Sequence, residues 1–178
     1  MTTSQLLHTE RLDLVAATLK HIEAELLDRT AFSELLGAEV PREWPPGEYD
    51  RNAQEYFRKR LEAGGPSLVG WLVWYAVTRT VPRTLVAGAG FSGPPAAGAV
   101  EIGYSVISAA RGTGYATEIV KALLVYAFAH PAVKEIVAQT TEGNAASIRV
   151  LSVCGFTRIG PGSEPGLVKY RITREEFA

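Results

Sequence analysis

The stretch Arg-Gly-Thr-Gly-Tyr-Ala at residues 111–116 joins two segments of different character. Before it runs an apolar, strand-like segment, residues 98–107, and after it comes a helical pattern that begins near Thr117. A glycine-bearing turn that leads from a strand into a helix presents backbone N–H groups that have no partner inside the helix, and the helix dipole adds positive potential there. The turn is therefore suited to binding a phosphate or a pyrophosphate.

The spacing of this turn narrows the choice of motif. No Gly-Lys-Ser/Thr closes it, so it is not the phosphate loop of NTPases, and it lacks the full dinucleotide fingerprint. It reads Arg-x-x-Gly-x-Ala, which resembles the acyl-CoA pyrophosphate loop of the GNAT superfamily of N-acyltransferases. The plain alternative is a glycine-rich turn from a strand into a helix with no ligand.

Two further segments carry the resemblance. Residues 144–156 read as a helix capped by Asn144 and ended by Gly155, followed by a strand, and they resemble the Asn-x-x-Ser and Gly-Phe block of GNAT enzymes. Residues 101–104, Glu-Ile-Gly-Tyr, resemble a strand signature of the branch related to the ribosomal-protein alanine N-acetyltransferases. The three blocks follow the family's order and spacing over residues 99–157, whereas the N-terminal part agrees in element order only.

The composition indicates one ordinary globular domain that spans residues 1–178. Of the 178 residues, 47% are hydrophobic and 21% are charged, and the net charge is −1. A near-zero charge gives no general affinity for nucleic acid or an anionic membrane, and no apolar run is long enough to cross a bilayer. The single cysteine, Cys154, fits a cytoplasmic protein, and no cluster has metal-ligand spacing, so we expect no metal. The sequence leaves monomer and homodimer open.

The order of elements predicts an α/β (α+β) fold. Strand patterns occupy residues 12–16, 71–77, 85–91, 99–107, 135–140, 156–159 and 168–172, and helical patterns lie among them. Strands run antiparallel early and alternate with helices late. The resemblance implies a single GNAT-like domain with a mixed, mostly antiparallel sheet of about six or seven strands, helices on both faces, and the fourth and fifth strands splayed apart.

The resemblance implies acetyl-CoA as co-substrate, bound where the strands at residues 99–107 and 135–140 splay. Backbone groups near Ser105 and Val106 would pair with the pantetheine arm, and Asn144 matches a residue that contacts this arm. Arg111 would contact a phosphate, or it would be a solvated surface arginine. Asn144 would contact the CoA arm, or it would only cap its helix. The pyrophosphate would rest on the turn and the start of the helix, at Gly112, Thr113, Gly114, Tyr115, Ala116 and Thr117.

The chemistry implied is direct attack of a primary amine on the thioester. The amine must first lose a proton, and Glu101 is the best candidate for the general base, with a carboxylate that only pairs across the sheet as the alternative. Many GNAT enzymes carry a tyrosine seven residues after the asparagine, as general acid to the CoA thiolate, but here this position is Leu151. Ser147 or water would then protonate the thiolate, unless the thiolate leaves unassisted.

The acceptor is predicted only as an amine, either a small molecule or a protein N-terminus. In the family, the first two helices and their loop build the acceptor wall, and here this region and the next strand hold Trp44, Tyr56 and Trp74. These aromatic residues would line the acceptor pocket, or they would simply pack in the core.

Two other classes of function stay open. The first is a catalytically silent acyl-CoA-binding sensor or interaction module, which Leu151 in place of the tyrosine keeps possible. The second is a generic nucleotide-binding protein, against which the turn lacks both a phosphate-contacting lysine and nearby carboxylates for magnesium.

Overall fold

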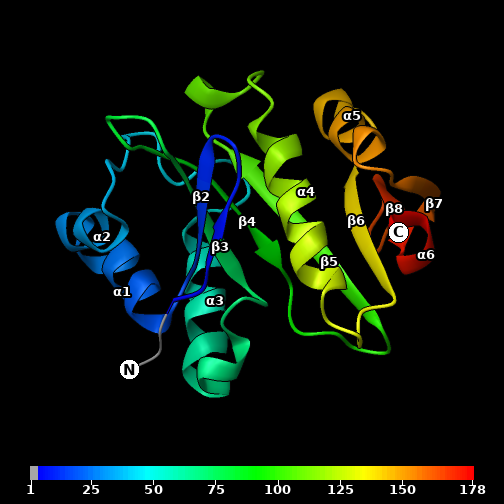
Figure 1. The fold of residues 1–178 in the computed structure, drawn as a ribbon, viewed down its shortest axis with the longest axis horizontal. Coiled ribbons are helices and arrows are strands. Elements are labelled where there is room, and N and C mark those ends of the chain that lie inside the picture. Colours follow the sequence, from blue (N-terminus) through cyan, green and yellow to red (C-terminus); the bar gives the residue numbers. More distant parts are fainter. Residues whose placement is uncertain (1–3) are drawn as a thin grey trace.

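Figure 1 shows the fold in a computed structural model that describes residues 4–178. Within these residues, one eight-stranded sheet has the order β1-β2-β3-β4-β5-β6-β8-β7. The strands are β1 (Leu6–His8), β2 (Leu12–Ala16), β3 (Val73–Thr78), β4 (Leu85–Phe91), β5 (Ala99–Val106), β6 (Glu135–Thr141), β7 (Thr157–Pro161) and β8 (Leu167–Thr173). The α-helices are α1 (Leu19–Leu27), α2 (Arg29–Leu36), α3 (Arg51–Gly64), α4 (Tyr115–Phe128), α5 (Ala145–Val153) and α6 (Arg174–Phe177).

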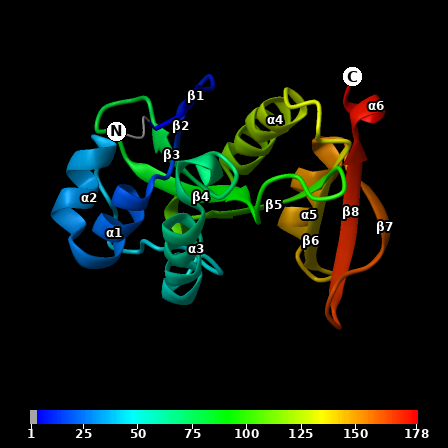
Figure 2. The ribbon, with the colours of Figure 1, turned by 90° about the horizontal axis from the view of Figure 1, so that it is seen from below.

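Helices cover both faces of the sheet, as predicted. Figure 2 shows α1, α2 and α3 beneath the sheet and α4 above it, and α5 packs against α4 and β6. The long apolar face of α4 buries Ile119, Val120, Leu123, Leu124, Ala127 and Phe128. Every residue of β3 is buried, because this strand lies inside the sheet and is covered on both faces.

The predicted fold class is confirmed, with two small corrections. The sheet has one more strand than the upper estimate, because the three-residue β1 pairs antiparallel with β2 and is too short to show a periodic pattern. Helix α4 begins at Tyr115, two residues before the predicted start, because Gly114 takes the capping position with φ +86°. Glycine adopts this positive φ without strain because it has no Cβ.

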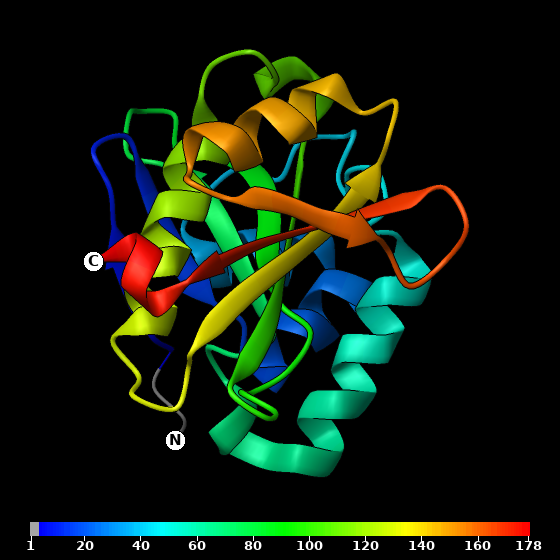
Figure 3. The ribbon, with the colours of Figure 1, turned by 90° about the vertical axis from the view of Figure 1, so that its right-hand side faces the viewer.

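The feature that organises the molecule is the separation of β5 from β6. These two parallel strands pair only at Ala99 with Glu135, Val100 with Ile136 and Glu101 with Val137. Beyond Glu101, β5 continues to Val106 and β6 to Thr141 without pairing to each other. Figure 3 shows the two strands diverging from this junction, with α5 across the wide end. The predicted splay is therefore present, and it opens a gap inside an otherwise continuous sheet.

Candidate active site

Glu101 lies at the junction where the gap begins. It is the last residue of β5 that pairs with β6, and its side chain is half-buried. The amide Nε2 of Gln139 on β6 donates to Glu101 Oε1 over 3.1 Å, and the backbone N–H of Ser163 donates to Gln139 Oε1 over 2.6 Å. Gln139 therefore orients the carboxylate from the neighbouring strand. The sequence did not single out Gln139, because its role depends on the register between strands far apart in the chain.

The register of β5 decides which backbone groups face the gap. In the ladder with β4, the N–H of Ser92 donates to Glu101 O and the N–H of Ile107 donates to Val86 O. Since hydrogen-bonded pairs alternate along an antiparallel ladder, the odd-numbered residues of β5 direct their N–H and C=O groups at β4. The even-numbered residues direct theirs at the gap, and these are Ile102, Tyr104 and Val106.

This register corrects the prediction for Ser105. Ser105 pairs with Gly88, so its backbone groups face β4 and not the gap. Its hydroxyl donates to the carbonyl of Pro46 over 3.1 Å, on the face of the sheet that α3 covers. Val106 does face the gap, and its carbonyl accepts a 3.1 Å hydrogen bond from Arg111 Nε. The pairing of Val106 with a pantetheine arm stays a prediction, and its N–H is the group positioned for it.

The turn before α4 has the conformation that an anion site needs. Gly112 and Gly114 have φ of +75° and +86°, a region where a Cβ costs free energy. No side chain caps α4, so the first N–H groups of the helix point outward. Arg111 is exposed and ties this turn to the end of β5. The residues predicted to contact the phosphates lie in this turn and in the first turn of α4: Arg111, Gly112, Thr113, Gly114, Tyr115, Ala116 and Thr117.

Arg11 contacts this turn, a contact that the sequence did not predict. It lies between β1 and β2, and its guanidinium donates to the carbonyl of Thr113 over 2.8 Å and to Glu118 Oε2 over 2.7 Å. The Arg11 guanidinium also lies over the ring of Tyr115, 4.6 Å from its centre. Since Glu118 brings negative charge to the first turn of α4, the pairing with Arg11 limits its repulsion of a bound anion.

The hydrogen bonds of Glu118 also lower its pKa. Burial alone would raise the pKa of this carboxyl, but hydrogen bonds from the Thr9 hydroxyl and from the backbone and side chain of Arg11 outweigh burial and hold the pKa below its usual value. Glu118 therefore stays ionised and paired at neutral pH.

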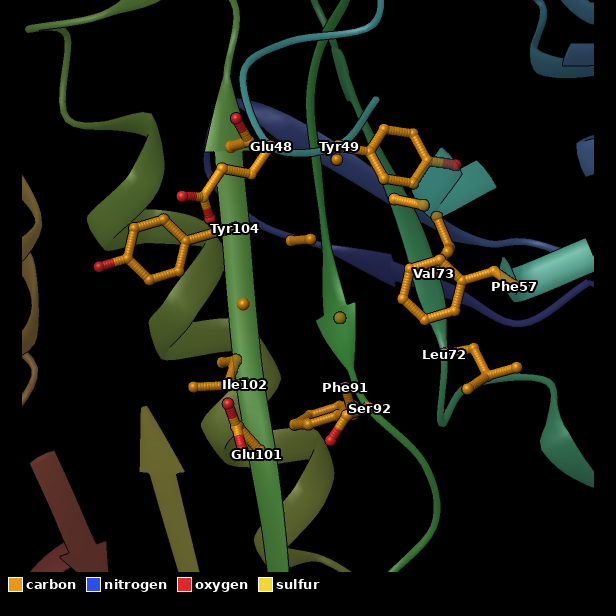
Figure 4. A pocket seen from close by; sticks show the side chains of 16 residues that line it. Glu48, Tyr49, Phe57, Leu72, Val73, Phe91, Ser92, Glu101, Ile102 and Tyr104 are labelled. Atoms are coloured by element: carbon orange, nitrogen blue, oxygen red, sulfur yellow. The ribbon is translucent and has the colours of Figure 1, made fainter. Parts of the chain in front are cut away.

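Across the gap, Ser147 contacts a tyrosine. The hydroxyl oxygen of Tyr104 on β5 lies 2.8 Å from Ser147 Oγ on α5, and burial raises the pKa of Tyr104 so that it keeps its proton at neutral pH. Figure 4 shows Tyr104 directed away from Tyr49 and Phe57, on the other side of β5. Leu151, at the position of the family tyrosine, is 1% exposed. Where the family has its tyrosine, this chain therefore has a buried leucine, and the hydroxyls of Ser147 and Tyr104 lie together between α5 and β5.

Asn144 caps α5, and its Oδ1 accepts from the N–H of Ser147 over 3.1 Å. The alternative role of Asn144 as a helix cap is thus present in the structure. Asn144 is also exposed, so a contact with the CoA arm stays a prediction. The cap and the contact are compatible, because the amide nitrogen of Asn144 is not used in the cap.

On the face of the sheet opposite α4, a pocket of about 300 Å³ lies between α3 and strands β3, β4 and β5. Glu101 lies at one end of the pocket and Glu48 near the other (Figure 4). Its floor holds Gly88, Gly90 and Gly103, so the strands there carry no side chains that would fill it. Its wall is mainly apolar, from Tyr49, Ala53, Phe57, Leu72, Val73, Phe91 and Ile102. The pocket therefore has room for an apolar group next to two carboxylates.

The three aromatic residues predicted for the acceptor do not line this pocket. Trp74 is fully buried and its indole N–H donates to Gly70 O over 3.0 Å, so the prediction that it contacts the acceptor is wrong. Trp44 is 5% exposed and its indole N–H donates to Glu25; it packs over Gly88 beside Tyr49. Tyr56 is 51% exposed, with the Arg60 guanidinium over its ring. The aromatic residues of this region that do line the pocket are Tyr49, five residues after Trp44, and Phe57, next to Tyr56.

A family model described as "Acetyltransferase (GNAT) domain" matches residues 16–157. The chain belongs to this family. The match includes the splayed strands, the turn before α4 and the helix that carries Asn144. The resemblance of residues 99–157 thus extends toward the N-terminus, into a region where the sequence had shown only element order.

One curated relative is FsC-acetyl coenzyme A-N(2)-transacetylase of Aspergillus fumigatus, 36% identical over 43% of this chain. The match spans 37% of that protein's length.

Solved structures share the fold over nearly the whole chain. The ribosomal-protein-S5-alanine acetyltransferase of Vibrio fischeri superposes with a TM-score of 0.65 at 16% identity, over 98% of this chain and 99% of that one. RimJ of Mycobacterium smegmatis, solved with CoA-disulfide, superposes with a TM-score of 0.64 at 20% identity, over 97% and 88%. At these identities the likeness shows the fold, and the Vibrio fischeri neighbour is named for the predicted branch, the ribosomal-protein alanine acetyltransferases.

Two other kinds of feature are absent from residues 4–178. No group of three His, Cys, Asp or Glu side chains in this part of the chain is arranged to hold a metal ion. None of the helices described has the length and apolar character that crossing a membrane requires.

Proposed function

We propose that this protein is an acetyl-CoA-dependent N-acetyltransferase that transfers the acetyl group directly to a primary amine. The observation that carries the proposal is the position of Glu101, which lies both at the start of the β5–β6 gap and at one end of the pocket on the α3 face. A thioester held in the gap and an amine held in the pocket would therefore meet beside one carboxylate. Acetyl as the acyl group is supported by the name of the Aspergillus relative.

The binding of acetyl-CoA rests on backbone groups. The N–H groups of the turn and the first turn of α4 would hold the pyrophosphate. Outward-facing groups of Ile102, Tyr104 and Val106 would pair with the pantetheine arm as an added strand does. Because these groups are fixed by the sheet and the helix, they need little rearrangement on binding.

In the reaction, Glu101 accepts a proton from the ammonium of the acceptor, directly or through one water. The free amine attacks the thioester carbon, the C–N bond forms, and the C–S bond breaks as the electron pair leaves with sulfur. The nitrogen, now bonded to the acyl carbon, then loses its second proton. The thiolate takes a proton from Ser147, whose Oγ is in contact with the Tyr104 hydroxyl and regains a proton from that nitrogen through water, or it leaves as the thiolate while the proton passes to solvent. Gln139 keeps Glu101 oriented throughout.

The acceptor is a primary amine with an apolar group close to the nitrogen. The carboxylates of Glu48 and Glu101 attract the ammonium form, and the apolar wall of the pocket accommodates the body of the molecule. A protein N-terminus with an apolar side chain and a small arylalkylamine both have this chemistry, and the pocket does not distinguish them.

The first experiment is calorimetric titration with acetyl-CoA, followed by measurement of thiol release with a panel of amines and short peptides. We expect micromolar binding and release of CoA thiol with apolar primary amines. Binding without release from any acceptor would favour the alternative of a sensor or interaction module. Absence of acetyl-CoA binding would overturn the assignment of the turn at residues 111–117.

A further inference from the structure

A partly buried carboxylate next to the acceptor pocket has no part in the reaction described above. Glu25, on α1, accepts four hydrogen bonds from side chains of three other segments. Its Oε1 accepts from Trp44 Nε1 over 2.8 Å and from Gln54 Nε2 over 2.9 Å. Its Oε2 accepts from the hydroxyls of Tyr49 and Tyr75 over 2.9 and 2.6 Å. A carboxylate has about four acceptor positions, so Glu25 is saturated.

One partner of Glu25, Tyr49, lines the pocket, and two others lie in segments that contribute to its wall. Trp44 and Tyr49 lie in the segment that we call the acceptor loop, residues 41–50, and Gln54 lies on α3 between the lining residues Ala53 and Phe57. Tyr75, on β3, is fully buried. Glu25 therefore connects the acceptor loop and α3 to the sheet through one side chain.

The acceptor loop has few other restraints. It contains no helix or strand, and its internal backbone bonds are turn bonds from Trp44 N–H to Pro41 O and from Tyr49 N–H to Pro46 O. Besides Glu25, residues of other segments also bind the loop: the Ser105 hydroxyl donates to Pro46 O, the Arg29 guanidinium donates to Pro41 O, and the Ala109 N–H donates to Glu43 Oε1. Loops with few backbone bonds take their position from side-chain contacts, so the bonds to Glu25 have a large share in placing this one.

Tyr49 transmits this restraint to the pocket. Its ring lines the pocket, and its hydroxyl points away from β5 toward Glu25 (Figure 4). The ring rests on Gly88, where an added Cβ would lie 3.3 Å from Tyr49 Cδ1. Glu48, the second carboxylate of the pocket, is the preceding residue. A shift of Tyr49 would therefore move both a wall and a charge of the acceptor site.

We propose that Glu25 is a positioning residue for the acceptor: it holds the acceptor loop and Tyr49 in the geometry that binds the amine, and it does not take part in binding acetyl-CoA. This proposal rests on the proposed function. Burial raises the pKa of the Glu25 carboxyl in spite of the bonds from Tyr75, Trp44, Tyr49 and Gln54, which is consistent with a structural group and not a solvent-exposed base.

The contacts of Glu25 predict that glutamine at this position can keep the hydrogen bonds to its partners, whereas alanine cannot. Trp44 and Gln54 present only N–H donors to it, whereas the hydroxyls of Tyr49 and Tyr75 can donate or accept. In Glu25→Gln, the amide oxygen can accept from Trp44 and Gln54 while the amide nitrogen donates to the two hydroxyls. In Glu25→Ala, four buried donors lose their acceptor, which is costly to the native arrangement.

The test measures steady-state kinetics with phenethylamine and an alanyl tripeptide as acceptors, and acetyl-CoA affinity by calorimetry. For Glu25→Ala we expect the acceptor KM to rise about tenfold or more, with acetyl-CoA affinity changed by less than about twofold. Glu25→Gln should restore the acceptor KM to within about threefold of the wild type. The matched control is Ile172→Ala, a core truncation on β8 that destabilises the fold away from the pocket.

An equal rise of the acceptor KM in Glu25→Ala and Ile172→Ala would overturn the proposal, as would a parallel loss of acetyl-CoA affinity. If Glu25→Ala does not fold, Tyr49→Phe removes one of the four bonds and keeps the ring. It should raise the acceptor KM about threefold, and an unchanged KM would contradict the proposal.

Failure of the proposed function would be visible separately, as an absence of thiol release by the wild type. In that case hydrogen exchange of residues 41–50 still tests the positioning role. Faster exchange in Glu25→Ala than in Ile172→Ala, restored in Glu25→Gln, supports it, and equal exchange overturns it.

Discussion

The two sides of the β5–β6 junction are built from different kinds of groups. On the acyl-CoA side, the candidate contacts are backbone N–H and C=O groups of β5 and of the turn before α4, within residues 102–117. On the acceptor side, the pocket is lined by side chains from the acceptor loop, α3 and three strands. Apart from Asn144 at the start of α5, the first side draws on one continuous segment, whereas the second needs segments that the fold alone brings together.

This difference affects how each side responds to substitution. Backbone sites tolerate many side chains but depend on glycine where φ is positive. Side-chain sites depend on the packing and hydrogen bonds that hold each residue in place. The predictions below use substitutions that affect one side and leave the other intact, in order of decreasing effect.

The largest effect is expected at Glu101, where the two sides meet. Glu101→Gln removes the base and keeps the hydrogen bond from Gln139, so kcat/KM should fall by about 100- to 1,000-fold. Calorimetry should show acetyl-CoA affinity within about twofold of the wild type, since the carboxylate lies outside the backbone contacts. The rate is measured by thiol release.

The control for this prediction is Glu48→Gln, which removes the other carboxylate of the pocket. It should act on the acceptor KM and not on kcat. Equal losses in the two variants would mean that Glu101 contributes negative charge only, and full activity of Glu101→Gln would remove it from the mechanism.

The acyl-CoA side should be most sensitive at Gly114. Alanine at φ +86° costs about 1–2 kcal/mol, so the turn would rearrange, and the acetyl-CoA dissociation constant should rise about tenfold. The same substitution at Gly160 on β7, where φ is +143°, is the matched control. It carries backbone strain far from the turn, and it should leave affinity unchanged. Similar affinities of the two variants would contradict a role for the turn in binding.

A smaller effect is expected at the pair of hydroxyls across the gap. Ser147→Ala should lower kcat about tenfold, and Tyr104→Phe about threefold, because the tyrosine acts through the serine. Neither should change the acceptor KM. The rate is measured by thiol release. The control is Ser152→Ala, which changes an exposed serine on the same helix and should leave kcat unchanged. If Ser147→Ala retains the wild-type kcat, the thiolate leaves without help from this residue.

The smallest effect concerns Glu118 and pH. Its folded pKa is lowered below the usual 4.5, so its contribution to stability is present above the unfolded pKa and is lost as pH falls through the folded pKa. The difference in unfolding free energy between wild type and Glu118→Gln should be about 1 kcal/mol at pH 7, or about 2–4 °C in Tm, after allowance for solvent screening.

Thermal unfolding between pH 3 and pH 8 measures this difference. It should be constant from pH 8 to about pH 5 and decline below about pH 4.5, toward the folded pKa of Glu118. A difference that persists unchanged at pH 3 would show that Glu118 acts through packing and not through its charged hydrogen bonds to Arg11 and Thr9.

The sequence by itself determined the fold class, and it predicted which segment would form the acyl-CoA side. The glycines of the turn, the cap at Asn144 and the periodic strands and helices are local signals, because each follows from backbone conformation or from side-chain spacing within one segment. Glu101 could be predicted from the sequence for the same reason, because it is part of a short signature in one strand. The short β1 was not, since three residues carry no period.

Only the tertiary structure decided the acceptor side and the supports of the site. The positions of Tyr49 and Phe57 in the pocket, and of Trp44 and Trp74 in the core, depend on which face of an element meets the sheet, and aromatic residues suit either place. Gln139, Arg11 and Glu25 act through partners far along the chain. Such contacts follow from strand register and helix packing, which spacing within a single segment does not encode.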